Sequence, residues 1–90
     1  MNPFTEKQIG KQTFVRTFNA DTPNEELIWH LDKENRIIES VGLTDWQFQF
    51  DNELPISLNN QIKIPKNTFH RIIKGSGDCT LKVIKLDESY

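Results

Sequence analysis

Hydrophobic and polar residues alternate one by one along much of the chain. The clearest case is WQFQFD over residues 46–51, in which Trp46, Phe48 and Phe50 alternate with polar residues. Successive side chains of a β-strand point to opposite faces, so this period of two predicts a strand with Phe48 and Phe50 in the core. Weaker alternation or β-branched composition predicts further strands over residues 13–18, 26–32, 36–41, 56–58, 62–64, 69–74 and 79–86.

Turn-forming residues separate these segments at short intervals. Clusters such as NADTPNE at 19–25, PKN at 65–67 and GSGD at 75–78 combine proline, glycine, asparagine and aspartate. No segment has the period of a helix longer than one turn. About eight short strands with turns every 8–12 residues predict an all-β, antiparallel sandwich or barrel.

The length and the distribution of polar residues predict one domain. Residues 1–11 are mostly polar and are expected to form a flexible N-terminal arm, followed by a single barrel domain over 12–86 and a frayed tail over 87–90. A domain of 90 residues has a modest core, and a second copy would enlarge it. Because Leu27, Trp29 and Leu31 share one face of the predicted strand 26–32, we expect a homodimer.

Composition and charge exclude several classes of protein. The net charge of −2 gives no broad electrostatic attraction for nucleic acid, so no nucleic-acid partner is expected. No stretch approaches the roughly 20 apolar residues of a membrane span, and residues 1–12 lack the apolar run of a signal peptide. Cys79 is the single cysteine, which favours a reduced, cytoplasmic location.

Two short motifs contain both histidines of the chain. The first is His30-Leu31-Asp32, followed by Arg36 and Gly42, and the second is IPKNTFH over residues 64–70, which ends at His70. Residues two apart on a strand point the same way, so His30 and Asp32 are expected to share a face. The chain contains no glycine-rich phosphate loop and no nucleophile elbow.

The stretch from about Leu27 to Leu86 resembles a small single-domain cupin, the RmlC-like jelly-roll barrel. In this family a motif with two histidines, a glutamate and a glycine precedes a motif with a proline, a glycine and a histidine. His30 matches the first histidine, while Asp32 and Arg36 stand where the second histidine and the glutamate are usual. Pro65 matches the proline, Asn67 stands where the glycine is usual, and His70 matches the last histidine.

The resemblance implies a cupin-type barrel in which His30, Asp32, Arg36 and His70 converge on one pocket. In the interpretation that we prefer, Asp32 pairs with Arg36, no cofactor is bound, and a non-catalytic module binds a small anionic ligand or a partner protein. On this interpretation Arg36→Glu, which restores the usual ligand type, would bind zinc or nickel far better than the wild type.

Two other interpretations stay open. Two imidazoles and a carboxylate are a usual ligand set for divalent metals, so His30, Asp32 and His70 could hold iron, manganese, zinc or nickel in an enzyme of the oxygenase or isomerase type. Alternatively, the pocket is vestigial and the chain is an interaction or structural protein. The sequence names neither a substrate nor a reaction, because the cupin fold supports many functions.

Overall fold

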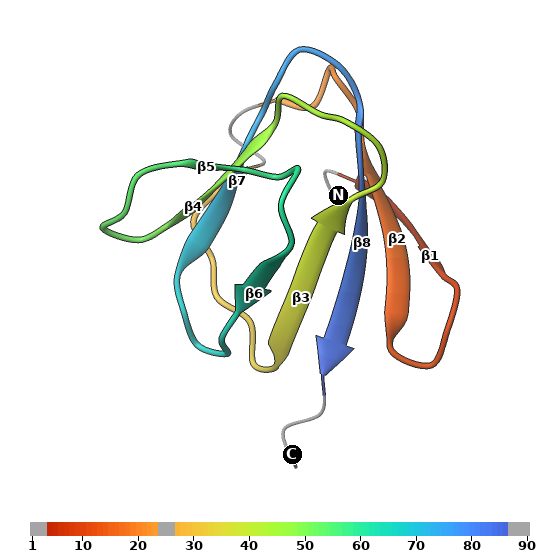
Figure 1. Ribbon diagram of the computed structural model, residues 1–90, viewed down its shortest axis with the longest axis vertical. Helices are drawn as coiled ribbons and strands as arrows, with labels where there is room; N and C mark the ends of the chain where they lie inside the picture. The colour runs from red at the N-terminus through yellow and green to blue at the C-terminus, as the bar shows by residue number, and fades with distance from the viewer. Residues whose placement is uncertain (1–3, 24–26, 87–90) are drawn as a thin grey trace.

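The computed structural model describes residues 4–23 and 27–86 (Figure 1). Within these residues the chain forms eight β-strands and no helix, so the predicted all-β class is confirmed. No helix of the described residues could therefore span a membrane. The strands are β1 (Phe4–Gln8), β2 (Thr13–Phe18), β3 (Asn35–Ser40), β4 (Gln47–Phe50), β5 (Ile56–Ser57), β6 (Ile62–Ile64), β7 (His70–Ile73) and β8 (Cys79–Leu86).

The described strands form two antiparallel sheets. The larger sheet has the order β1-β2-β8-β3-β6, and the smaller one has the order β5-β4-β7. Figure 1 shows β4, β5 and β7 on one side of the molecule and the long strands β2, β3 and β8 on the other. Four of the six neighbouring pairs of described strands, β2–β8, β8–β3, β3–β6 and β4–β7, join strands that are not consecutive in the sequence, as in a jelly roll. This arrangement brings β7 and the segment before β3 together at the site.

Alternation along the strands fills the space between the sheets with apolar side chains. The larger sheet contributes Phe18, Ile38, Leu81 and Val83, and the smaller one contributes Phe48, which is 0% exposed. Phe50 also packs against this core, so both core predictions for β4 are confirmed.

The segment 26–32 was predicted as a strand, and this prediction is wrong for residues 27–32. Only an isolated bridge between His30 and His70 forms there. Leu27 packs against the core and Ile28 is 63% exposed, yet both line the same cavity, which the alternation of a regular strand would not allow. The apolar face expected for a homodimer is therefore not a sheet face, and the homodimer stays a prediction.

The predicted flexible arm is wrong for residues 4–8, which form β1. This strand pairs with β2 from Phe4↔Phe18 to Gln8↔Phe14. Phe4 packs against Phe18 with the ring centroids 5.4 Å apart. Burial of one aromatic ring and a complete hydrogen-bond ladder hold a strand whose other residues are polar. Residues 1–3 of the arm, residues 24–26 and the predicted tail 87–90 lie outside the described residues.

Gly75 lies where another side chain would not fit. A Cβ atom at this position would overlap the Asp45 carboxylate and would lie 2.7 Å from Cδ1 of the buried Trp46. We expect Gly75→Ala to lower the free energy of unfolding by about 1–3 kcal/mol, as overpacking generally does. Gly77→Ala is the matched control, because nothing lies within 4 Å of its Cβ position. Equal stability of the two variants in urea denaturation would contradict this packing.

Candidate functional site

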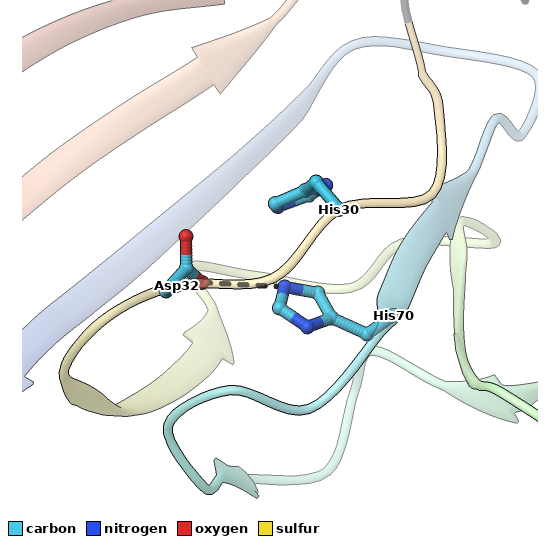
Figure 2. Close-up of side chains that lie close together, drawn as sticks. All are labelled: His30, Asp32 and His70. Atoms are coloured by element: carbon cyan, nitrogen blue, oxygen red, sulfur yellow. Dashed lines mark ion pairs between the residues drawn. The ribbon is translucent and has the colours of Figure 1, made fainter.

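His30, Asp32 and His70 meet where the segment before β3 passes the start of β7 (Figure 2). Backbone hydrogen bonds fix this crossing. The His30 amide donates to the His70 carbonyl at 3.0 Å, and the His70 amide donates to the His30 carbonyl at 2.9 Å. The Asn67 amide donates to the Asp32 carbonyl at 2.7 Å. One potential metal-ligand atom from each of the three side chains lies within 4.8 Å of the others.

Both imidazole rings donate a hydrogen bond to the backbone through Nδ1. His30 Nδ1 lies 3.0 Å from the Ile28 carbonyl oxygen, and His70 Nδ1 lies 2.8 Å from the Thr68 carbonyl oxygen. A carbonyl oxygen can only accept, so Nδ1 carries the proton in each ring and Nε2 of the neutral ring is an acceptor. Metal-binding histidines are commonly oriented in this way.

The Asp32 carboxylate lies between His70 and Arg36. Its Oδ2 is buried, lies 3.4 Å from His70 Nε2, and has no hydrogen-bond partner among the described residues. Its Oδ1 lies 3.4 Å from Nη2 of Arg36. Burial by itself would raise the pKa of Asp32, but the His70 ring and the Arg36 charge outweigh it, so the pKa lies below its ordinary value and the group is anionic.

Arg36 makes its closest contacts with Glu34, a residue that the sequence did not assign to the site. Arg36 Nε and Nη2 both donate to Glu34 Oε1, at 2.9 and 2.6 Å. The expected contact between Asp32 and Arg36 is present but longer. Because Glu34 neutralises the guanidinium, Asp32 keeps Oδ2 available on its other side. The spacing of two residues between Glu34 and Arg36 is a signal that could have identified this pair.

A cavity of about 230 Å³ lies beside the three side chains. Its polar end holds the four residues that the sequence predicted, His30, Asp32, Arg36 and His70. The structure brings all four together, whereas their role in ligand binding stays a prediction. Phe48 stacks against the His70 ring with the centroids 5.3 Å apart. The rest of the wall is mostly apolar and includes Phe4, Phe18, Leu27, Ile28, Ile38, Ile64, Ile72, Leu81 and Val83, with Arg16 as a further charged residue.

Arg71 follows His70 on β7 and does not line the cavity, because successive side chains of a strand point to opposite faces. Its guanidinium carbon lies 4.6 Å from the centroid of the Trp29 ring, and its Nε donates to Gln49 Oε1 at 2.9 Å. Arg71 therefore holds Trp29 on the outside of the barrel.

The three side chains fit a divalent cation. His70 Nε2 and Asp32 Oδ2 face each other at 3.4 Å, and when the ring is neutral both atoms are acceptors, which repel unless a proton or a cation lies between them. His30 presents its own Nε2 lone pair, because its Nδ1 is engaged. Two imidazole nitrogens and one carboxylate oxygen are suitable ligands for iron, manganese, zinc or nickel.

The lowered pKa of Asp32 makes the stability of the metal-free protein depend on pH. In the unfolded chain the group takes up its proton near the ordinary pKa of 3.8, and in the folded chain at a lower pH. The contribution of Asp32 to the free energy of unfolding is complete above its pKa in the unfolded chain. It is lost as the pH falls through its pKa in the folded chain. We therefore expect the free energy of unfolding of wild type relative to Asp32→Asn to fall between pH 5 and pH 2. A pH-independent difference in urea denaturation would contradict this.

Comparison with known proteins supports the fold. No protein-family model matches the chain, and a sequence search of curated proteins found no match. Solved structures do match. A cupin-2 domain containing protein from Shewanella frigidimarina is 13% identical with a TM-score of 0.64, over 92% of this chain and 80% of that one. A cupin domain from Bordetella pertussis is 9% identical with a TM-score of 0.57, over 97% and 98% of the two chains.

A structure of FeII HppE is also similar, with a TM-score of 0.65 and 12% identity over 92% of this chain and 48% of that one. Identities this low show the fold and not the activity. The two antiparallel sheets, their strand order and these similarities together show that the chain has the cupin-type jelly-roll fold that its motifs resemble.

Proposed function

We propose that the chain is a metal-dependent cupin-type enzyme in which His30, Asp32 and His70 hold one divalent cation beside the cavity. The observation that carries this proposal is the buried Asp32 Oδ2, which has no hydrogen-bond partner among the described residues and faces His70 Nε2. Because a buried carboxylate oxygen without a hydrogen bond is costly, and the other oxygen of Asp32 has only a 3.4 Å contact with Arg36, a cation at this position explains the arrangement better than an empty polar pocket.

The donor set favours a catalytic metal over a structural one. Three protein ligands leave coordination positions open, whereas structural sites usually fill four positions with protein side chains. A bound divalent cation supplies a Lewis acid that polarises an oxygen of a small molecule or activates water. The FeII form of HppE supports iron among the four metals, and an enzyme of the oxygenase or isomerase type fits this chemistry.

The residues of the chain prepare the site in separable ways. The Ile28 and Thr68 carbonyls hold the two Nδ1 protons, so that both Nε2 atoms stay acceptors. Arg36 binds the second oxygen of Asp32 and limits the rotation of the carboxylate. Phe48 supports the buried His70 ring, whereas His30 lies at the solvent-exposed side of the site, where a small molecule can reach the cation.

Isothermal titration calorimetry with zinc on protein without a chelating tag tests the proposal. We expect one site with a submicromolar Kd near neutral pH, and weaker binding at pH 5 because protons compete for the ligands. A Kd in the millimolar range would refute the proposal. So would tight binding that persists when both histidines are replaced by glutamine.

The contact between Asp32 Oδ1 and Arg36 Nη2 favours a second candidate, the metal-free pocket. In it His70 is protonated and pairs with Asp32, and the non-catalytic pocket binds a small carboxylate or phosphate. The two candidates predict different metal affinities. The metal-free pocket predicts that wild type binds zinc weakly and Arg36→Glu binds it far better, whereas the metal site predicts tight binding by wild type.

A further inference from the structure

Arg16 places a positive charge in the apolar wall of the cavity. On β2 it alternates with outward residues and shares the inner face with Phe14 and Phe18, which pack against the core. The neighbouring strand places Leu81 directly opposite Arg16. The Arg16 side chain is only 13% exposed, and it lines the same cavity as His30, Asp32 and His70. Neither the sequence motifs nor the proposed metal site accounts for it.

Stability does not explain an arginine at this position. Its partner is Glu6 on β1, whose side chain is 27% exposed, and an ion pair open to solvent on one side contributes little to stability. The contact also lacks the two parallel hydrogen bonds of a bidentate arginine–carboxylate pair. Arg16 Nε and Nη2 both donate to the single oxygen Glu6 Oε1, at 3.0 and 2.6 Å, and Nη1 has no hydrogen-bond partner among the described residues.

The guanidinium is nevertheless held in one orientation. Its central carbon lies 3.9 Å from the centroid of the Phe4 ring, and Glu6 fixes one edge of the group. A guanidinium with spare donors and a fixed orientation is well prepared for an anion, because little side-chain entropy is lost when the anion binds.

The size and polarity of the cavity limit the molecule that fits. An apolar protein cavity of about 150 Å³ holds benzene, and this cavity measures about 230 Å³. One ring or short aliphatic chain with a small polar group therefore fits. Arg16 lies opposite Leu81 and Arg36 lies opposite Lys85, on the two strands that flank β8. Their Cα atoms are thus separated by about 13 Å along the strands and about 10 Å across them.

We propose that the cavity binds a small monocarboxylate with an apolar body, and that Arg16 is the specificity residue that receives its carboxylate. The apolar body packs against residues such as Phe18, Ile38 and Leu81 and extends toward His30 and His70. This inference rests on the proposed function only for the metal at the His30 and His70 end of the cavity, because the contact between the carboxylate and Arg16 requires no metal.

Three probes on the wild-type chain test the class of ligand. Phenylacetate carries the ring and the carboxylate, phenylacetamide is its neutral counterpart, and acetate carries the carboxylate alone. With binding followed by calorimetry and by the NMR signal of Arg16 Nε–H, we expect phenylacetate to bind at least about tenfold more tightly than either control. Equal affinities for phenylacetate and phenylacetamide, or no binding of phenylacetate, would overturn the proposal.

Arg16→Gln removes the charge and keeps a polar side chain, and Arg71→Gln is the matched control on the outer side of β7. We expect Arg16→Gln to lose about tenfold in affinity for phenylacetate and to lose the preference over the amide, while Arg71→Gln keeps both. Unchanged phenylacetate binding by Arg16→Gln would overturn the assignment. If Arg16→Gln does not fold, the affinities of the wild type for phenylacetate and phenylacetamide, with the NMR signal of Arg16 Nε–H, still test the proposal.

Zinc titrations of the same proteins separate this inference from the proposed function. We expect Arg16→Gln to bind zinc within about twofold of wild type, because Arg16 is not among the three side chains that cluster as metal ligands. Zinc binding without discrimination between the probes would refute the carboxylate site and leave the metal site intact. If Arg16 is needed for the preference for phenylacetate over phenylacetamide but the wild type does not bind zinc, the metal site is refuted and the carboxylate site stands.

Discussion

Asp32→Asn is expected to weaken zinc binding by about a hundredfold or more. The substitution keeps the size of the side chain and removes the anionic oxygen that faces His70 Nε2. Zinc sites with four protein ligands contribute about 10–16 kcal/mol, or roughly 3 kcal/mol for each ligand, and each 1.4 kcal/mol is a factor of ten in affinity. Competition calorimetry against a chelator of known affinity measures a change of this size.

Asp51→Asn is the control for this experiment. Asp51 is exposed in the turn after β4 and does not line the cavity, so its substitution removes the same charge away from the site. We expect its zinc affinity to equal that of wild type. If the two variants lose zinc affinity equally, the net charge of the protein determines the affinity and Asp32 is not a ligand.

Phe48→Ala is expected to lower the free energy of unfolding by about 3–5 kcal/mol, as removal of a buried phenylalanine generally does. Phe48 is fully buried, and its ring contacts that of Phe50, with the centroids 4.8 Å apart. It also stacks on His70. The cavity left by Phe48 would free the imidazole to tilt, so zinc affinity should fall with stability. Urea denaturation and zinc calorimetry measure the two effects.

Phe69→Ala provides the comparison for Phe48→Ala. Phe69 precedes β7 and is 50% exposed, so removing its ring leaves little cavity, and we expect a loss below about 1 kcal/mol. A loss that small for Phe48→Ala as well would mean that the ring of Phe48 is not packed between the sheets.

Much of the fold follows from alternation along the chain. Strand β8 coincides with the predicted segment 79–86, and β4 lies within 46–51, because each buries every second side chain between the sheets. The failures have a common physical reason. Segment 27–32 and strand β1 are governed by contacts with distant residues, His70 and Phe18, which the local pattern of apolar residues does not contain.

The candidate site was partly predictable. The motif resemblance predicted that His70 lies beside His30 and Asp32. The structure also explains why asparagine can replace the glycine that usually precedes His70 in this motif. Asn67 has φ 60°, a left-handed conformation that asparagine tolerates better than most residues. Neither Arg16 nor Glu34 was predicted, since the role of Arg16 depends on the pairing of β2 with β8, more than 60 residues later in the chain.

Nitrogen NMR of the two imidazole rings, with and without zinc, tests the metal site most directly. In the zinc-free protein we expect Nδ1 of His30 and of His70 to carry the proton that the Ile28 and Thr68 carbonyls accept. On addition of one equivalent of zinc, both Nε2 resonances should shift to metal-bound values while both Nδ1 protons stay in place. If zinc leaves either Nε2 resonance unchanged, or displaces an Nδ1 proton, the cation is not held as we propose.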